Sequence, residues 1–370
     1  MENKNVKLTE VLSDLKNNNA NFYFFTLDTK GNPTAGIANI YEHVKVLTEL
    51  GYKAHILHEK NDYKLHGDEN GMGVSDWLGL EYANLSHVSV EAQQLSVRPS
   101  DFIIIPEVFA TVMEQVKTFP CKKIVLSQSP EYMFELLPIG KRWTTDYGFY
   151  DVITTSETQA EHIGNHFPDA KTYVVPVSIP EYFKNSSKPK IPVVSVLCRN
   201  QSDTVKLTKS FYLQYPLYKW ITFKELRGLP REQFAEELSK SFLAIWVDDL
   251  AGFGTFPVEA MECETPIIGK IPNIVPEWMK TADEAGEVSL LNNGIWTNTT
   301  HNIPELIGQY IKLWLEDNEP KEILDEMVKS KGKYTETKQK EKIEQVYGKL
   351  LSDRINEIET AVKQSELQEI

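Results

Sequence analysis

Short, continuous apolar runs alternate with helix-length amphipathic segments along most of the chain. Residues 21–26 (NFYFFT) form an aromatic-rich run of strand length. From Gly36 onward, apolar residues recur at spacings of three and four, which predicts a helix, and Gly51 stands where its C-cap belongs. Residues 54–57 are the next apolar run. This order predicts a crossover in a parallel sheet, with the helix beginning at the carboxyl edge of the strands, where α/β sheets bind ligands.

Similar runs further along predict more buried strands, because continuous apolar character is typical of parallel strands covered on both faces. These predicted strands lie at residues 101–106, 123–126, 152–155, 172–177, 193–197, 219–223 and 242–247. The later helices are predicted around residues 211–215, at 231–241 and beyond Pro304. The last charged segment, about residues 345–370, is predicted as an amphipathic helix with a solvated outer face.

The stretch 181–192 (EYFKNSSKPKIP) has the composition of a linker, and the 370 residues are about twice the usual length of one domain. We therefore expect an α/β protein with two Rossmann-like domains, residues 1–185 and 186–345, whose parallel sheets face each other across a cleft. The polar segment 59–75 is predicted as a loop near the functional edge of the first sheet. A plain solvated connection is the alternative.

Charge and composition argue against several classes of function. The formal net charge is −14 at pH 7, and such a field repels nucleic acid and anionic lipid. The three cysteines, Cys121, Cys198 and Cys263, form no CxxC pair, which predicts buried thiols in a reducing compartment. The N-terminus has no apolar signal-peptide core, and no run approaches the roughly 18 apolar residues of a spanning helix. A cytoplasmic protein is therefore expected.

The segment 248–269 (DDLAGFGTFPVEAMECETPIIG) carries the clearest chemical signal. It directly follows a predicted strand, and the glycines of GFG let the backbone approach a ligand closely. Thr255 and Pro257 favour the start of a helix after this turn, where the first N–H groups have no partner within the helix. The arrangement predicts an anion site. Glu259, expected in the first turn, would accept hydrogen bonds from hydroxyl groups of the bound molecule.

As a whole, GFGTFPVEAMECETPIIG closely resembles the GFGLPxLEAMACGTPVVG signature of retaining GT-B glycosyltransferases of family four. Other segments are similar to the family in the same order, namely the glycine and helix at Gly36, YDVITTSETQAEHI, VVPVSIP, and the arginine of VSVLCRNQ. The resemblance covers about residues 21–320 and is strong over 251–269. It implies a GT-B fold with a nucleotide-sugar in the cleft, a C-terminal helix returning to the first domain, and no bound cofactor or metal.

The resemblance also implies roles for single residues. In the family, the arginine that Arg199 matches contacts the donor diphosphate, and the glutamate that Glu259 matches binds the nucleotide ribose. Lys206 is the nearest candidate for the lysine that accompanies this arginine, although TVKLTKS reads equally well as an exposed helix face. The implied donor-binding residues are Gly36, Arg199, Lys206, Gly252, Phe253, Gly254, Thr255 and Glu259.

One position departs from the family pattern. The family has two glutamates spaced as E-x7-E; Glu259 matches the second, and Ala251 stands at the first. The first glutamate normally contacts the donor sugar, so its absence bears on sugar recognition and turnover. Asp248 or Asp249, two or three residues upstream, is the alternative contact. Glu264 stands where the family usually has glycine, which we interpret as a surface change.

In the first domain, Glu107 and Gln128 follow predicted strands and are therefore expected at the ligand-binding edge. Both are catalytic candidates beside Arg199, and a plain loop role is the alternative for each. Retaining enzymes of this class are thought to let the departing phosphate take the acceptor proton, so the rate comes mainly from positioning and charge stabilisation. Arg199 and the backbone N–H groups of residues 252–255 would then stabilise the leaving diphosphate.

Other chemistries have little support. His162 and His166 are four residues apart, but no third metal ligand accompanies them, and adjacent Asp248 and Asp249 would point to opposite faces of an extended chain. No GxSxG, P-loop or GxGxxG motif is present. Peripheral membrane contact stays open through the small basic segment 117–123 (KTFPCKK), with an ordinary solvated surface as the alternative.

The sequence thus predicts a hexosyltransferase-like, metal-independent enzyme. It would move a sugar from a nucleotide-sugar to a glycan, lipid-linked or protein acceptor with retention of configuration, and its expected partners are the nucleotide-sugar and a carbohydrate-type acceptor. A catalytically silent GT-B protein that serves an active transferase as partner or chaperone is the alternative, motivated by Ala251. A two-domain solute receptor has the same architecture but would need an export signal. Nucleic acid is not an expected partner.

Overall fold

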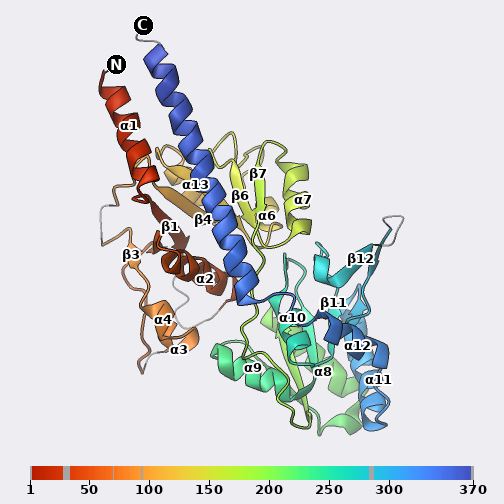
Figure 1. The fold of residues 1–370 in the computed structure, drawn as a ribbon. Coiled ribbons are helices and arrows are strands. Elements are labelled where there is room, and N and C mark those ends of the chain that lie inside the picture. Colours follow the sequence, from red (N-terminus) through yellow and green to blue (C-terminus); the bar gives the residue numbers. More distant parts are fainter. Residues whose placement is uncertain (1, 28–33, 70, 93–94, 283–286, 368–370) are drawn as a thin grey trace. The chain divides into compact units, whose positions relative to one another are not determined.

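The computed structural model describes residues 2–27, 34–69, 71–92, 95–282 and 287–367. The chain divides into two compact units (Figure 1). Unit 1 consists of Met1–Thr155, Ala160–Pro176 and Thr337–Ile370, and unit 2 consists of Ser156–Gln159 and Val177–Glu336. The chain therefore passes between the units near residues 155–160, at 176–177 and at 336–337.

Unit 1 is built on a seven-stranded parallel sheet with the order β3-β2-β1-β4-β5-β6-β7. The strands are β1 (Asn21–Thr26), β2 (Lys53–His58), β3 (His87–Ser89), β4 (Phe102–Pro106), β5 (Lys122–Ser127), β6 (Asp151–Thr154) and β7 (Lys171–Val174). The helices are α1 (Glu2–Lys16), α2 (Ala35–Glu49), α3 (Val74–Trp77), α4 (Leu80–Ala83), α5 (Ala110–Val116), α6 (Tyr132–Leu136), most of α7 (Glu157–His166) and α13 (Glu336–Leu367). The strand order reverses between β1 and β4, and the carboxyl ends of the strands at such a point are where α/β sheets generally bind ligands.

Unit 2 has a five-stranded parallel sheet with the order β14-β11-β10-β8-β9. Its strands are β8 (Ile191–Cys198), β9 (Thr222–Glu225), β10 (Ser241–Val247), β11 (Ile267–Lys270) and β14 (Ile295–Thr297), and β12 (Lys280–Ala282) pairs antiparallel with β13 (Val288–Leu290). Its helices are α8 (Gln201–Gln214), α9 (Arg231–Lys240), α10 (Thr255–Glu262), α11 (Ile303–Leu315) and α12 (Lys321–Ser330), with three short 3-10 turns, Pro216–Tyr218, Glu277–Met279 and Thr300–Asn302. In both units the strands of the main sheet are parallel and alternate with helices, as predicted for an α/β protein.

The first crossover follows the predicted pattern closely. Thr34 caps α2 because its side chain accepts a hydrogen bond from the backbone N–H of Ile37 at 3.3 Å. The helix ends at Glu49, and Gly51 follows its C-cap residue Leu50 with a φ of +85°, the left-handed conformation that glycine adopts without strain. The apolar stripe of α2, which includes Val44 and Leu47, is fully buried against the sheet.

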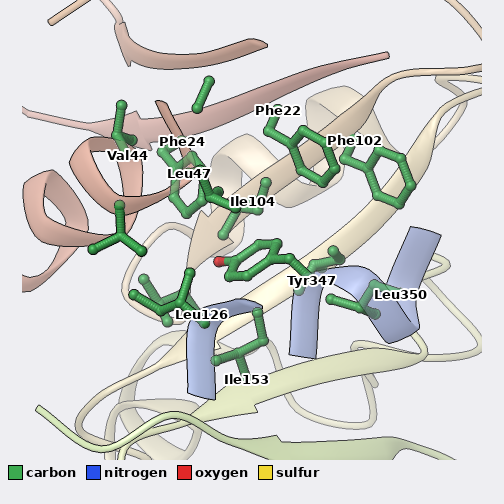
Figure 2. Close-up of a cluster of buried hydrophobic side chains, with 14 of the residues drawn as sticks. Phe22, Phe24, Val44, Leu47, Phe102, Ile104, Leu126, Ile153, Tyr347 and Leu350 are labelled. Atoms are coloured by element: carbon green, nitrogen blue, oxygen red, sulfur yellow. The ribbon is translucent and has the colours of Figure 1, made fainter. Parts of the chain in front are cut away.

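The C-terminal helix α13 belongs to unit 1 and closes its core, which confirms the predicted return to the first domain. Figure 2 shows Tyr347 and Leu350 of α13 among side chains from α2 and the strands. The hydroxyl group of Tyr347 lies 2.9 Å from Nδ1 of His43, and both residues are fully buried. Lys16 of α1 pairs with Glu359 of α13 at 2.6 Å, and the two helices lie side by side (Figure 1).

Three sequence-based predictions differ from the structure. Residues 2–16, for which the sequence pattern predicted no element, form helix α1, because Val11 and Leu15 pack into the core that α13 completes. The strand predicted at 219–223 lies at 222–225, after a 3-10 turn. The helix predicted to begin near residue 345 begins at Glu336.

The stretch 181–192 is packed on unit 2 rather than suspended between domains. Phe183 is buried in the core of that unit. The ammonium group of Lys190 donates to the carbonyl oxygens of Ser239 and Cys263 and to Oγ1 of Thr265, at 2.8, 3.1 and 2.9 Å. These carbonyl groups lie at the ends of α9 and α10, so the lysine satisfies acceptors that the helices leave open. Composition alone does not reveal these contacts.

The structure also bears on the expectations about membrane-spanning helices, the three cysteines and the basic segment 117–123. None of the described helices is both long enough and apolar enough to cross a bilayer. All three cysteines are buried free thiols, and burial raises the pKa of each above its usual range. In the basic segment 117–123, Lys117 pairs with Glu114, and Lys122 pairs with Asp151 at 2.8 Å, so acidic partners offset its charge.

Candidate active site

The GFG turn of unit 2 lies between the end of β10 and the start of α10. Gly254 is the N-cap of α10, with φ +73° and ψ +77°. A Cβ atom at this position would lie 2.8 Å from Cζ2 of Trp246, too close for any real side chain. Both the backbone conformation and the available space therefore require glycine here. The first N–H groups of α10 follow directly, which is the anion-binding arrangement expected from sequence.

A buried network of tryptophan side chains holds this turn in place. Nε1 of Trp278 donates to the carbonyl oxygen of Phe253 at 2.7 Å. Asn293, which is fully buried, donates from Nδ2 to the carbonyl oxygen of Trp278 at 2.7 Å and accepts from Nε1 of Trp296 at 3.2 Å. The ring of Trp246 lies within 6.5 Å of both other indoles. The turn is thus anchored on a rigid aromatic base, which is a condition for binding an anion with backbone groups.

Gly254→Ala is expected to lower the free energy of unfolding by about 2–3 kcal/mol, since it adds left-handed strain of about 1 kcal/mol to the steric conflict with Trp246. Denaturant titration measures the change. Gly228→Ala is the matched control, because Gly228 has φ +77° but no atom within 4 Å of its Cβ position. Equal losses in the two variants would show that strain alone, and not the contact with Trp246, restricts residue 254.

Arg199 lies at the carboxyl end of β8, beside the start of the 248–254 segment. Its backbone N–H donates to the carbonyl oxygen of Val247 at 2.8 Å, because β8 and β10 are neighbours in the sheet. Its Nε donates to Oδ1 of Asp248 at 2.5 Å, and both side chains are partly exposed, at 28% and 21%. Asp248 Oδ1 also accepts from the N–H of Leu250 at 3.2 Å. The sequence proposed both residues for the donor site but did not predict that they pair.

Glu259 is placed differently from the prediction. It is the fifth residue of α10 and not part of the first turn, and it is only 1% exposed. Its Oε1 accepts from Nη2 of Arg231, the first residue of α9, at 2.6 Å. Burial lowers the pKa of Arg231, but the charge of Glu259 and contacts with Tyr182 outweigh this and raise it. Arg231 was not identified from sequence; its position one residue after Pro230, at the start of a predicted helix, was the available signal.

The remaining unit 2 candidates have distinct surroundings. Ala251 is 5% exposed and packs in the apolar core of the unit. Asp249 pairs with Lys270 at 2.6 Å, so it and Asp248 have different partners.

Lys206 is 77% exposed on α8, 3.7 Å from Asp203, and no described contact links it to Arg199. Glu264, with φ +50°, accepts from Nδ2 of Asn185 at 2.6 Å and pairs with Lys331.

In unit 1, Gly36, Glu107 and Gln128 meet at the carboxyl edge of the sheet. Nε2 of Gln128 donates to the carbonyl oxygen of Gly36, and its Oε1 accepts from Nδ2 of Asn39, both at 3.1 Å. Gln339 of α13 continues this chain of amides by donating to Oδ1 of Asn39 at 3.0 Å. The sequence pattern pointed to Gly36 and Gln128 at one edge but not to Asn39 and Gln339, which lie 300 residues apart.

Glu107 holds the loop at this edge of the sheet by accepting hydrogen bonds from its backbone. It is 2% exposed, and its Oε1 accepts from the backbone N–H groups of Gln128 and Ser129 at 2.9 and 2.5 Å. This geometry is that of a loop-supporting carboxylate, and its assignment as a catalytic group stays a prediction. A Cβ atom on Gly36 would lie 3.4 Å from Nε2 of Gln128, so glycine permits close packing there.

The histidine pair stays at the surface of unit 1. Nδ1 of His166 lies 2.8 Å from the carbonyl oxygen of His162, and the ring of Phe134 meets both imidazoles edge-on. Within the described residues, no group of three or more His, Cys, Asp or Glu side chains is arranged to hold a metal ion. The aromatic run 21–26 is core, as predicted, with Phe22 and Phe24 fully buried.

Solved structures of other proteins share the architecture of this chain. The pneumococcal O-GlcNAc transferase GtfA, solved with UDP and GlcNAc, superposes with a TM-score of 0.61 at 9% sequence identity, over 91% of this chain and 99% of that one. Anabaena Alr3699/HepE, solved with UDP-glucose, superposes with a TM-score of 0.56 at 12% identity, over 89% of this chain and 99% of that one. The chain has the GT-B fold.

A curated sequence relative agrees with this fold. An alpha-1,6-glucosyltransferase from Actinobacillus pleuropneumoniae serotype 7 (strain AP76) is 24% identical over 244 residues. The matched region is 62% of this chain and 66% of that relative, just under two thirds of its length. No protein-family model matches the sequence. The chain is thus similar in sequence, over part of its length, to an alpha-1,6-glucosyltransferase, and similar in fold to the two solved structures above.

Proposed function

We propose that this GT-B protein is a retaining glycosyltransferase of the family-four type, which transfers a hexosyl group from a nucleotide-sugar to a carbohydrate-type acceptor. The observation that carries the proposal is the combination in unit 2 of a glycine-capped helix N-terminus after β10 with Arg199 at the end of the neighbouring strand. Such an edge offers several N–H donors and a guanidinium group to one diphosphate. The similarity to a glucosyltransferase and the UDP-glucose in a structural neighbour favour UDP-glucose as the first donor to test.

Each group has a defined part in this reaction. Arg199 and the N–H groups of residues 252–255 bind the diphosphate and stabilise the charge that develops on it when the glycosidic bond to the sugar breaks. A phosphate oxygen of the leaving diphosphate takes the proton of the acceptor hydroxyl, so the chain needs no separate base. Glu259 binds the ribose hydroxyls. In unit 1, Gln128 holds the carbonyl oxygen of Gly36 and so fixes the start of α2 at the carboxyl edge of that unit's sheet.

The donor-site assignment is tested by calorimetry with UDP, GDP, ADP, CMP and TDP. We expect one diphosphate to bind, and Arg199→Ala and Glu259→Ala each to weaken its binding by about 1–3 kcal/mol, the value of a hydrogen bond to a charged group. Lys224→Met is the matched control, because it removes an ion pair with Glu237 on α9 that lies outside the site. Release of glucose from UDP-glucose then measures catalysis. Binding that neither Arg199→Ala nor Glu259→Ala changes would contradict the assignment.

A catalytically silent partner protein is the second candidate. Two observations favour it, namely apolar Ala251 at the position of the family's first glutamate and the pairing of Arg199 with Asp248. In the transferase, Asp248 would have to release Arg199 to the diphosphate or contact the donor sugar in place of that glutamate. Failure of every nucleotide to bind would favour the silent protein, whereas measured sugar release from UDP-glucose would exclude it.

A further inference from the structure

We propose that Arg231 is the positioning residue of the ribose site: its guanidinium group holds one carboxylate oxygen of Glu259 and so directs the other toward the ribose hydroxyls of the donor. The inference rests on the proposed function and adds a residue that lies outside the signature segment. It starts from the location of the two side chains, since Arg231 is the first residue of α9 and Glu259 is in the middle of α10.

The Arg231–Glu259 ion pair is largely buried, and Glu259 is the more deeply buried of the two side chains. The side chain of Glu259 is 1% exposed and that of Arg231 is 17% exposed, with 2.6 Å between Oε1 and Nη2. A carboxylate this deep in a protein needs a cationic or hydrogen-bonding partner to stay ionised. Arg231 supplies that partner from a different helix, so the placement of the Glu259 carboxylate depends on the contact between α9 and α10.

The guanidinium group is itself fixed by aromatic rings. It lies 4.8 Å from the ring centroid of Phe183 and 5.5 Å from that of Phe234. Phe183 is 3% exposed and Phe234 is 7% exposed, so neither ring moves freely. Arg231 also donates a side-chain hydrogen bond to the phenol oxygen of Tyr182. A planar cation held between rings and a hydroxyl has one orientation, and it imposes that orientation on the carboxylate it binds.

The arrangement leaves one oxygen of Glu259 for a ligand. Arg231 donates to Oε1, and no described group donates to Oε2. A ribose has adjacent 2′ and 3′ hydroxyl groups, and either can donate to a carboxylate oxygen. Without Arg231, the carboxylate would lose its orientation, and the site would no longer distinguish a ribose from a deoxyribose. Arg231 therefore acts on the donor through Glu259 and makes no contact with it.

The test compares the affinities of the full-length protein for UDP, 2′-deoxy-UDP and 3′-deoxy-UDP by calorimetry. Should the wild type prefer another diphosphate, the deoxy forms of that diphosphate replace them. We expect the wild type to bind UDP about 10- to 100-fold more tightly than at least one deoxy form, the effect of one hydrogen bond to a charged group. In Arg231→Met, this ratio is expected to fall to within about twofold, while the affinity for the deoxy form changes little.

Further variants separate positioning from folding. Glu259→Gln is expected to lower the same ratio, and adding Arg231→Met to Glu259→Gln should lower it no further, because both changes remove one effect. This double variant also avoids an unpaired buried charge, so it reports on a folded protein if Arg231→Met alone unfolds. Arg231→Lys should restore part of the ratio. Lys224→Met, which removes the ion pair with Glu237 on the same helix, should leave the ratio unchanged.

The outcomes distinguish this inference from the proposed function. If Arg231→Met is folded and keeps the wild-type ratio, or loses affinity for all three nucleotides equally, Arg231 does not position Glu259. If the wild type binds UDP but does not distinguish the deoxy forms, the ribose is not read by Glu259 and the inference is wrong, while the donor site stands. If the wild type binds no nucleoside diphosphate, both the proposed function and the inference are overturned.

Discussion

Replacing Tyr347 of α13 with alanine is expected to lower the free energy of unfolding by about 3–5 kcal/mol, the usual cost of removing a large aromatic side chain from a core. Tyr347 is fully buried, and its ring lies 5.9 Å from the rings of Phe22 and Phe24 and 5.8 Å from that of His43. Because the contacts join the last helix to the first strand, the loss should appear as a lower midpoint of denaturant unfolding of unit 1.

Two variants give this result its meaning. Tyr347→Phe keeps the ring but leaves Nδ1 of His43 without its partner 2.9 Å away, so a smaller loss of about 1–3 kcal/mol is expected. Tyr150→Ala is the surface control, because that side chain is 45% exposed, and it should change the stability by less than about 0.5 kcal/mol. A loss below about 1 kcal/mol for Tyr347→Ala would mean that α13 is not an integral part of the core.

Stability is expected to fall by about 4 kcal/mol between pH 7 and pH 5 through two buried histidines alone. Desolvation by burial lowers the pKa of His43 from 6.5 to about 3, and desolvation together with the nearby His87 lowers that of His58 to about 3 as well. The folded state therefore holds both rings neutral, while the unfolded chain protonates them near pH 6.5. Their contribution is complete above pH 6.5 and is lost as the pH falls from there toward 3, at about 2 kcal/mol per histidine by pH 5.

Denaturant titrations of His43→Gln and His58→Gln across pH 5–8 measure these contributions. Glutamine does not titrate, so each variant should lose about 2 kcal/mol less than the wild type over this range, whatever its stability at pH 7. Wild-type and variant curves of equal slope would show that the histidines protonate freely in the folded protein. His301, in an exposed turn of unit 2, is the matched control, and His301→Gln should leave the slope unchanged.

The fold could be predicted from local patterns wherever the residues of one element are enough to show where it begins, where it ends and which face is buried. The α2 segment shows why: a cap, a stripe of apolar residues and a terminal glycine are all contained within 18 residues, Thr34 to Gly51. Helix α1 has no such completeness. Its buried residues Val11 and Leu15 acquire their core from α13, which lies more than 300 residues further along the chain, so the local sequence predicts no element there.

The site follows the same division. The GFG turn, the start of α10 and the position of Arg199 at a strand end depend on residues close in sequence, and their types predict their conformation. The partners of the candidate residues do not. Arg199 pairs with Asp248, 49 residues away, and Glu259 pairs with Arg231, 28 residues away. Neither composition nor residue spacing predicts these two pairs.

By itself, the sequence determined the α/β class, the order of most strands, the helix that begins at Gly36, and the glycine turn that opens α10. These features depend on side-chain periodicity and backbone permissiveness, which act over a few residues. Only the tertiary structure decided that Tyr347 completes the first core, that Glu107 supports the loop at Gln128, and that Arg231 holds Glu259. Each of these requires distant side chains to meet, and burial gives their charges and hydrogen bonds a strength that they do not have in the unfolded chain.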